Sequence, residues 1–316
     1  MEGLGNSIKE AAERLLNEGD VDLVIGYERG TTPLRSTPCF IRDSGDVDRL
    51  IWDPTCDANL AKYLIGQDAK IGVFVKGCDA RSAVVCIAEG QIDRDKVVLI
   101  GLPCSGVVDR KKIDSVLDGR EILDATVDEE KITVRGEDFE EELPTKNFLC
   151  DSCLSCRHRT PTVYDIMIGD TPTEEPDTDE YAEVDELESM TAEERWAHFV
   201  EELSSCIRCY SCRNVCPMCY CKECFVDETM PAWFGKTNDL SDTMIYHIVR
   251  SLHLAGRCVD CGACSRSCPM GIDLRTLLKK GEKIVKERFS FEAGMDVEEK
   301  PVMSVFKQED SEEFVI

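Results

Sequence analysis

Two twelve-residue stretches decide the fold of the C-terminal half: CIRCYSCRNVCP at residues 206–217 and CVDCGACSRSCP at residues 258–269. Each spaces its cysteines as C-x2-C-x2-C-x3-C-P, the arrangement with which ferredoxins hold two 4Fe-4S clusters. The first three thiolates of a run bind one cluster, and the fourth, which precedes proline, binds the other. This crossed pattern predicts one cluster on Cys206, Cys209, Cys212 and Cys268, and a second on Cys258, Cys261, Cys264 and Cys216.

The cysteine content fits clusters better than disulfides. The chain has 19 cysteines in 316 residues, and its first residues, MEGLG, lack the basic start and apolar core of a secretory signal. No segment approaches the roughly 18 apolar residues that a membrane span requires. We therefore expect a cytoplasmic protein with reduced cysteines. Because clusters at this density are oxygen-sensitive, we expect an anaerobic host.

The charge narrows the choice of partners. A net charge of -26 argues against binding to nucleic acids and to anionic membranes, and it favours docking on a basic face of another protein. Part of the acidity is local, since residues 170–188 hold ten carboxylates and little apolar content. This composition is typical of a linker or of a solvated loop.

The fold class predicted is α+β: an N-terminal α/β domain with a partly parallel sheet, followed by a mainly α-helical 4Fe-4S dicluster ferredoxin domain. Short β-branched runs predict strands, and apolar residues at helical spacing predict helices. The expected strands are 21–26, 71–75 and 97–101 with a hairpin at 122–127 and 131–135, and the expected helices are 7–17, 80–89, 192–204, 240–255 and 274–287. The expected division is an α/β domain at 1–168, an acidic linker at 169–190, the ferredoxin domain at 191–290 and an acidic tail at 291–316.

Two further cysteine groups have three members each. Cys150, Cys153 and Cys156 have cluster spacing, and Cys104 is the first choice for a fourth ligand because it follows a predicted parallel strand, where ligands of open α/β sheets collect. Cys219, Cys221 and Cys224 form the other group, with an unusual one-residue gap and no assigned fourth ligand. Either group could instead hold structural zinc. Cys39, Cys56 and Cys78 are further candidates for a missing ligand, although Cys78 and Cys86 also fit as small buried residues.

The segment KGCDAR at 76–81, GLPCSG at 101–106 and the cysteines at 150–156 resemble the beta subunits of deazaflavin-coenzyme-reducing hydrogenases and formate dehydrogenases. The resemblance covers residues 65–170 and implies a 4Fe-4S cluster beside FAD, with the Pro-Cys loop and the C-x2-C group as the cluster positions. It also gives Lys76 and Arg81 a candidate role as partners of the FAD pyrophosphate, against the simpler alternative of surface salt bridges. After the cysteine group this chain departs from the family, which continues its α/β fold, so much of the flavin pocket is expected to be missing.

The wide helical spacing between the ferredoxin runs resembles the α-helical ferredoxin domains of heterodisulfide reductase C subunits and of succinate dehydrogenase iron-sulfur subunits. His198, His247 and His253 are expected to be structural or exposed, since the cysteines suffice as ligands. The sequence shows no Gly-x-Gly-x-x-Gly fingerprint and no residues with an evident catalytic pattern.

The function expected is that of an iron-sulfur electron-transfer subunit, without catalytic residues of its own, within an anaerobic redox complex of hydrogenase, formate dehydrogenase or heterodisulfide-reductase type. Two alternatives stay open. One is an FAD-containing subunit that itself oxidises or reduces a soluble carrier, and the other is a docking scaffold whose outer cysteine groups hold zinc.

Overall fold

The computed structural model describes residues 2–170, 179–233, 235–306 and 308. The N-terminal half is built on a five-stranded sheet in the order β2-β1-β3-β4-β8. Strands β1, β3, β4 and β8 run parallel and β2 pairs antiparallel with β1, which confirms the partly parallel sheet. The strands span Leu23–Arg29 (β1), Ser36–Ile41 (β2), Ile71–Val75 (β3), Val97–Gly101 (β4) and Ile166–Met167 (β8).

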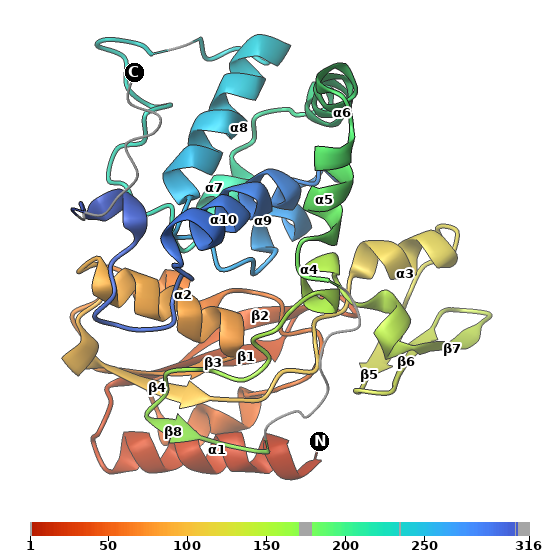
Figure 1. Ribbon diagram of the computed structural model, residues 1–316. Helices are drawn as coiled ribbons and strands as arrows, with labels where there is room; N and C mark the ends of the chain where they lie inside the picture. Colours follow the sequence, from red (N-terminus) through yellow and green to blue (C-terminus); the bar gives the residue numbers. More distant parts are fainter. Residues whose placement is uncertain (1, 171–178, 234, 307, 309–316) are drawn as a thin grey trace.

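Helices cover both faces of this sheet, which is why β3 is buried along its whole length. Helix α1, Glu2–Asn17, lies against one face, and α2, Gly77–Ala88, lies against the other (Figure 1). Helix α1 contributes Ile8, Ala12 and Leu15, at helical spacing, to the core on its side. Both helices begin earlier than predicted. The prediction missed their first turns because these carry glycines and polar residues rather than an apolar face.

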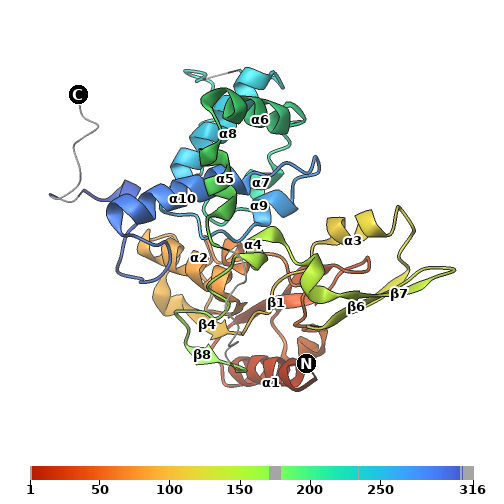
Figure 2. The same ribbon diagram turned by 45° about the vertical axis from the view of Figure 1, so that its right-hand side comes forward.

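A second, three-stranded sheet stands beside the first (Figure 2). It consists of β5, Asp124–Val127, β6, Lys131–Arg135, and β7, Glu140–Pro144, with α3, Arg110–Val116, packed near it. The hairpin of β5 and β6 was predicted. Strand β7 was not, because Glu140, Glu141 and Glu142 show no apolar alternation and only Leu143 is buried.

The C-terminal half is helical and stacks on the α2 side of the larger sheet (Figure 1). The helices α6, Ala192–Ser204, α8, Leu240–Leu254, and α10, Arg275–Phe289, match the predicted ones within two residues at each end. Three short helices each carry one cysteine of a clustered group: α4, Asp151–Leu154, α7, Ser211–Asn214, and α9, Ala263–Arg266. None of the helices in the described part of the chain is long and apolar enough to cross a membrane.

Part of the expected acidic linker is a helix. Residues 171–178 lie outside the described residues, but Ala182–Ser189 forms α5, whose carboxylates pair with lysines on α10. For example, Lys283 Nζ lies 2.5 Å from Asp185 Oδ1 and 2.5 Å from an oxygen of Glu188. The negative charges that suggested a solvated segment thus face the basic side of a neighbouring helix.

The two halves share one hydrophobic core. Leu60 and Ala83 from the first half belong to the same buried cluster as Met218 and Leu254 from the second. The start of the expected tail also belongs to it, because Phe291 and Ala293 are buried and Arg81 Nε donates to the Ala293 carbonyl at 2.9 Å. Packing therefore continues across the boundaries that composition suggested.

Candidate iron-sulfur sites

The two ferredoxin runs repeat one local geometry. Arg208 and Asp260, each two residues after the first cysteine, have left-handed backbone with φ of 50° and 53°. Their backbone N–H groups donate to the preceding sulfurs, Arg208 to Cys206 Sγ and Asp260 to Cys258 Sγ, both at 3.4 Å. Such N–H···S bonds are a means by which proteins orient cluster ligands and adjust cluster potentials.

Two residues after Arg208 and Asp260, the backbone of each run is left-handed again: Tyr210 has φ of 59° and Gly262 has φ of 69°. It turns the chain into α7 or α9, which carries the third cysteine of the run. Gly262 meets a second constraint, because a Cβ there would lie 2.3 Å from the Ser152 Oγ of the third cysteine group. Only glycine accommodates both the backbone and this contact.

The thiols predicted for the first cluster lie near one another. Burial raises the pKa of Cys206, and among its electrostatic neighbours are the three other predicted ligands, Cys209, Cys212 and Cys268. Of these neighbours, Cys268 belongs to the second run, at 258–269, which is the placement that the crossed pattern predicts. Iron binding would deprotonate these thiols, so the raised pKa describes the metal-free chain.

The thiols predicted for the second cluster line one small cavity of about 30 Å³. Its walls include Cys216 from the first run together with Cys258, Cys261 and Cys264 from the second. Burial raises the pKa of Cys264 to about 12. Four thiols that converge on one cavity from two runs fit a cubane cluster.

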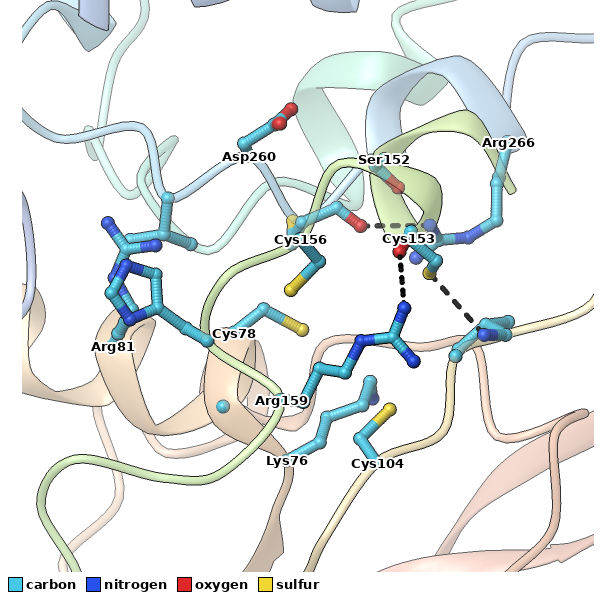
Figure 3. Close-up of a pocket in the computed structure, with 16 residues that line it drawn as sticks. Lys76, Cys78, Arg81, Cys104, Ser152, Cys153, Cys156, Arg159, Asp260 and Arg266 are labelled. Atoms are coloured by element: carbon cyan, nitrogen blue, oxygen red, sulfur yellow. Dashed lines mark hydrogen bonds between the residues drawn. The ribbon is translucent and has the colours of Figure 1, made fainter. Parts of the chain in front are cut away.

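A third cavity, of about 40 Å³, lies where the two halves meet (Figure 3). Its walls carry Cys104, Cys153 and Cys156, which are three of the predicted ligands, together with Cys78. Cys78 stands in the first turn of α2, directly after β3, and Cys104 follows β4, so both lie at the carboxyl edge of the parallel sheet. The remaining predicted ligand, Cys150, lines an adjacent cavity with Asp109 and Asp151, and its thiol hydrogen-bonds with that of Cys153.

Backbone contacts fix the shape of this third cavity. The segment after Cys156 crosses the start of α2 so closely that a Cβ on Gly77 would lie 1.7 Å from the His158 carbonyl oxygen. The Cys104 N–H donates to the Arg159 carbonyl at 3.0 Å, which joins the Pro-Cys loop to the same segment. Backbone contacts thus hold the Pro-Cys loop and the start of α2 against the segment after Cys156.

The thiol-lined cavities adjoin one another. The third and second share Val259, Asp260 and Cys261 as wall residues. The second shares Met218, Arg250 and Leu254 with a cavity of about 340 Å³ that Cys219, Cys221 and Cys224 line. In that cavity a hydrogen bond with Cys216 lowers the pKa of Cys219 to about 7. Among the described side chains, no three His, Cys, Asp or Glu residues are placed to hold a single metal ion.

Helix α8 brings polar groups to the first cluster's sulfurs. The Tyr246 hydroxyl lies 3.6 Å from Cys212 Sγ, and His247 Nε2 lies 3.4 Å from Cys206 Sγ. Burial, with Arg250 and Arg208 nearby, lowers the pKa of His247 to about 4, so its imidazole is neutral. The sequence had suggested only a structural or exposed role for His247, because helical spacing does not reveal which neighbour a buried side chain meets.

Two arginines, the buried Arg250 and the half-buried Arg266, lie among the cysteine loops. Arg250 donates to the Cys212 carbonyl at 3.1 Å, and Arg266 donates to the carbonyls of Cys261 and Asp57 at 2.8 and 2.6 Å. Burial alone would lower the pKa of Arg266, yet Cys150 and other acidic neighbours hold it above its ordinary value. A fixed positive charge in a dry region stabilises an electron added nearby.

The two cations considered for a flavin are already engaged. Lys76 is buried, and its Nζ donates to the Tyr27 hydroxyl, the Ala58 carbonyl and Asp79 Oδ2 at 2.5, 2.8 and 2.9 Å. Arg81 is also buried and lies 3.5 Å from a Glu292 oxygen. Neither forms the surface salt bridge that was the simpler expectation, and both use their charge on partners within the chain.

Comparisons with known proteins find two family profiles along this chain. Residues 68–202 match the profile for the C terminus of the beta subunit of coenzyme F420 hydrogenase/dehydrogenase, and residues 205–273 match that of the 4Fe-4S dicluster domain. The first match extends beyond residue 170, where the resemblance seen in the sequence ended. Both matches confirm the resemblance to these beta subunits and the dicluster domain.

Curated relatives are similar along nearly their whole length. The chain is 24% identical over 362 residues to the F420-dependent formate dehydrogenase subunit beta of Methanocaldococcus jannaschii, an alignment that covers 95% of this chain and 94% of the relative. It is 26% identical over 364 residues to F420-dependent formate dehydrogenase 1 subunit beta of Methanococcus maripaludis, covering 95% and 93%. Both halves of this chain therefore align with these relatives. The sequence alone had suggested that the chain departs from the family after the cysteine group at 150–156.

A solved structure, the F420-reducing [NiFe] hydrogenase complex from Methanosarcina barkeri, contains a chain that aligns with a TM-score of 0.36 and 19% identity. The alignment covers 51% of this chain and 59% of that one.

Proposed function

We propose, from the similarity of this chain to the beta subunits of F420-dependent formate dehydrogenases, that it relays single electrons within a multisubunit formate dehydrogenase or hydrogenase complex. The other subunits of that complex are its partners. When bound, 4Fe-4S clusters supply one-electron redox chemistry and change no substrate bonds. The chain's own contribution is to hold them close together, keep water away and set the charge around them.

The observation that carries this proposal is the shared wall between two cavities. Cys261 lines both the second cavity, as a predicted ligand, and the third cavity, which Cys78, Cys104, Cys153 and Cys156 also line. Clusters held in these places would lie next to each other across the junction of the two halves. A relay needs such adjacency, whereas a zinc-bearing scaffold does not.

The geometry also favours one ligand set for the third cluster. Cys78 reaches the cavity directly from the first turn of α2, while Cys150 lines the neighbouring cavity. We therefore infer that Cys78 completes the set with Cys104, Cys153 and Cys156, and that Cys150 supports Cys153 through their hydrogen bond. Changing Cys78 to Ser should remove the third cluster's EPR signal, whereas changing Cys150 to Ser should leave a shifted signal. The opposite pattern would restore Cys150 as the ligand.

The flavin alternative fits less well. The similarity to F420-dependent enzymes favours a flavin somewhere in the complex, since their carrier takes up hydride equivalents. In this chain, however, Lys76 already donates to three internal partners that a pyrophosphate would have to displace, whereas the buried Arg81 Nη2 makes no hydrogen bond among the described residues. Bound FAD found after anaerobic isolation, or tight binding of added FAD, would favour the flavoenzyme subunit.

The experiment that tests the relay is anaerobic purification with iron, sulfide, zinc and flavin quantified per chain. Three clusters require about 12 iron atoms, since each cubane holds four. Iron near 8 accompanied by stoichiometric zinc would contradict the relay and support the scaffold. Redox titration followed by EPR should then show interacting signals from neighbouring clusters.

A further inference from the structure

The cavity lined by Cys219, Cys221 and Cys224, which we call the Cys219 cavity, is not used by the three-cluster relay. It encloses about 340 Å³, compared with about 30 and 40 Å³ at the second and third sites. It lies between the loop after the first ferredoxin run and the end of α8. Its three thiols come from six consecutive residues, so the chain brings them to one wall without help from the rest of the fold.

An imidazole also lines this cavity. His253, in the last turn of α8, lines the same cavity as the three thiols, and its ring packs edge-on against Phe225 with centroids 5.3 Å apart. Three thiolates and one imidazole make a complete ligand set for a cubane cluster, in which His can replace Cys. The sequence left this fourth ligand unassigned because His253 is 29 residues from Cys224 and only the position of α8 brings the two together.

Basic groups surround the thiols. Lys62 Nζ donates to the carbonyls of Cys216 and Cys219 at 3.2 and 3.1 Å. The Arg213 guanidinium hydrogen-bonds to the Cys224 side chain and lies 2.8 Å from an Asp227 oxygen. These cations come from separate segments, and they balance part of the charge that thiolate ligands bring.

The spread of these ligands, rather than the size of the cavity, separates a cluster from a single ion. A zinc site closes four ligands around one atom at about 2.0 to 2.3 Å, which leaves no room between them. Here the described thiols and imidazole surround an open volume, and no three of the described acidic, His or Cys side chains are placed for one ion. Ligands that stand apart in this way suit a group of several atoms better than one ion.

We propose that the Cys219 cavity binds a fourth 4Fe-4S cluster, held by Cys219, Cys221 and Cys224 with His253 as the fourth ligand. The proposal rests on the relay in one respect: the cavity adjoins the second cluster site through Met218, Arg250 and Leu254, so the fourth cluster extends the relay at that point. Replacing a thiolate by a neutral imidazole raises a cluster's reduction potential. With Lys62 and Arg213 nearby, this cluster is the electron-accepting end of the series.

The first test removes the three thiols. Wild-type protein reconstituted under anaerobic conditions should contain about 16 iron atoms per chain, and a variant with Cys219, Cys221 and Cys224 changed to Ser should contain about 12. The EPR signals of the other three clusters report whether that variant is folded. If the wild type contains about 12 iron atoms, or if the variant loses zinc instead of iron, the fourth cluster is excluded while the relay stands. A wild-type value near 8 would overturn the relay itself.

The second test concerns His253. A directly bound imidazole gives a strong ¹⁴N coupling in pulsed EPR, which His253→Cys should abolish while it retains the iron and lowers the midpoint potential of that cluster alone. His253→Ala should lose the same coupling and yield a three-iron cluster or no cluster. The matched control is His198→Ala on α6, whose histidine does not line the cavity and should change neither readout. Strong ¹⁴N coupling that persists in both His253 variants would overturn this residue as ligand.

Discussion

At the scale of single residues, Cys216 is where the cysteine groups meet. It ends the first ferredoxin run, lines the cavity of the second cluster and hydrogen-bonds with Cys219 at the edge of the Cys219 cavity. The spacing of the run predicted its role in the second cluster, but not its contact with another cysteine group. The position of this one thiol makes the crossed ligand pattern testable.

Changing Cys216 to Ser should therefore perturb the cluster of the distal run. We expect an altered or lost EPR signal from the cluster on Cys258, Cys261 and Cys264, because Ser is a poorer ligand for iron. The matched variant Cys209→Ser should affect the other cluster, whose fourth ligand is Cys268. If both substitutions alter the same signal, the crossed assignment is wrong.

Glu282 on α10 links stability to pH. Its side chain is buried, with Lys279 Nζ 3.6 Å away, and burial raises its pKa to about 7. The unfolded chain releases this proton near the ordinary glutamate pKa of about 4.3, while the folded chain retains it to higher pH. The contribution of Glu282 to stability is therefore complete below the lower value and is lost as pH rises through the folded pKa.

Replacing Glu282 by Gln should remove this dependence. Relative to wild type, the variant should gain roughly 1 to 3 kcal/mol of unfolding free energy between pH 5 and pH 8. Because cluster loss makes unfolding irreversible, the comparison is the difference in unfolding midpoint between variant and wild type, recorded by circular dichroism on anaerobic heating at one scan rate at both pH values. A stability difference between variant and wild type that stays constant with pH would show that Glu282 keeps an ordinary pKa.

At the scale of elements, α8 does more than separate the two ferredoxin runs. Its apolar spacing predicted a helix with a packed face, and the helix is there. Its polar residues serve the clusters: Tyr246 and His247 reach sulfurs of the first site, Arg250 reaches a carbonyl of the same loop, and His253 lines the Cys219 cavity. One helix thus provides polar groups at two cysteine groups.

Removing a hydrogen bond from α8 should lower the potential of the first cluster. In Tyr246→Phe, Cys212 Sγ loses the hydroxyl at 3.6 Å, and the more negative reduced state loses a stabilising donor. A redox titration monitored by EPR should show a lower midpoint for this cluster and unchanged midpoints elsewhere. Leu252→Ala, on the exposed side of the same helix, is the control. An equal shift in both variants would point to a general loosening of α8.

At the scale of the whole molecule, the two halves are joined by packing and by polar contacts. Besides the shared core, Lys111 Nζ donates to the Cys268 carbonyl at 2.8 Å and Arg266 donates to Asp57. Both contacts join a cysteine loop of the ferredoxin half to the α/β half. The architecture thus changes near residue 168, where the domain boundary was proposed, but the hydrophobic core continues from one half into the other.

This continuity predicts a single unfolding transition. Loss of visible cluster absorbance and loss of far-ultraviolet circular dichroism should coincide on anaerobic heating, because separating the halves would expose the core containing Leu60, Met218 and Leu254. Cluster loss makes unfolding irreversible, so both signals must be recorded at one scan rate. Two well-separated transitions would show that the halves are stable independently.

Sequence by itself determined the features that depend on local spacing. The cysteine runs predicted the dicluster domain, the β-branched runs predicted β3 and β4, and apolar spacing predicted α6, α8 and α10, because turns, strands and helices repeat over a few residues. The crossed ligand sets also follow from spacing, and they stay a prediction that the Cys216 and Cys209 variants test.

Only the tertiary structure decided which distant groups meet. Cys78 joins the cavity of Cys104, Cys153 and Cys156 because β3 and β4 are neighbouring parallel strands. His253 lines the same cavity as Cys219 because α8 packs against Phe225. The linker composition likewise concealed α5, whose carboxylates are stabilised by lysines on another helix. Such contacts depend on packing between segments far apart in the chain, which the spacing within any one segment does not specify.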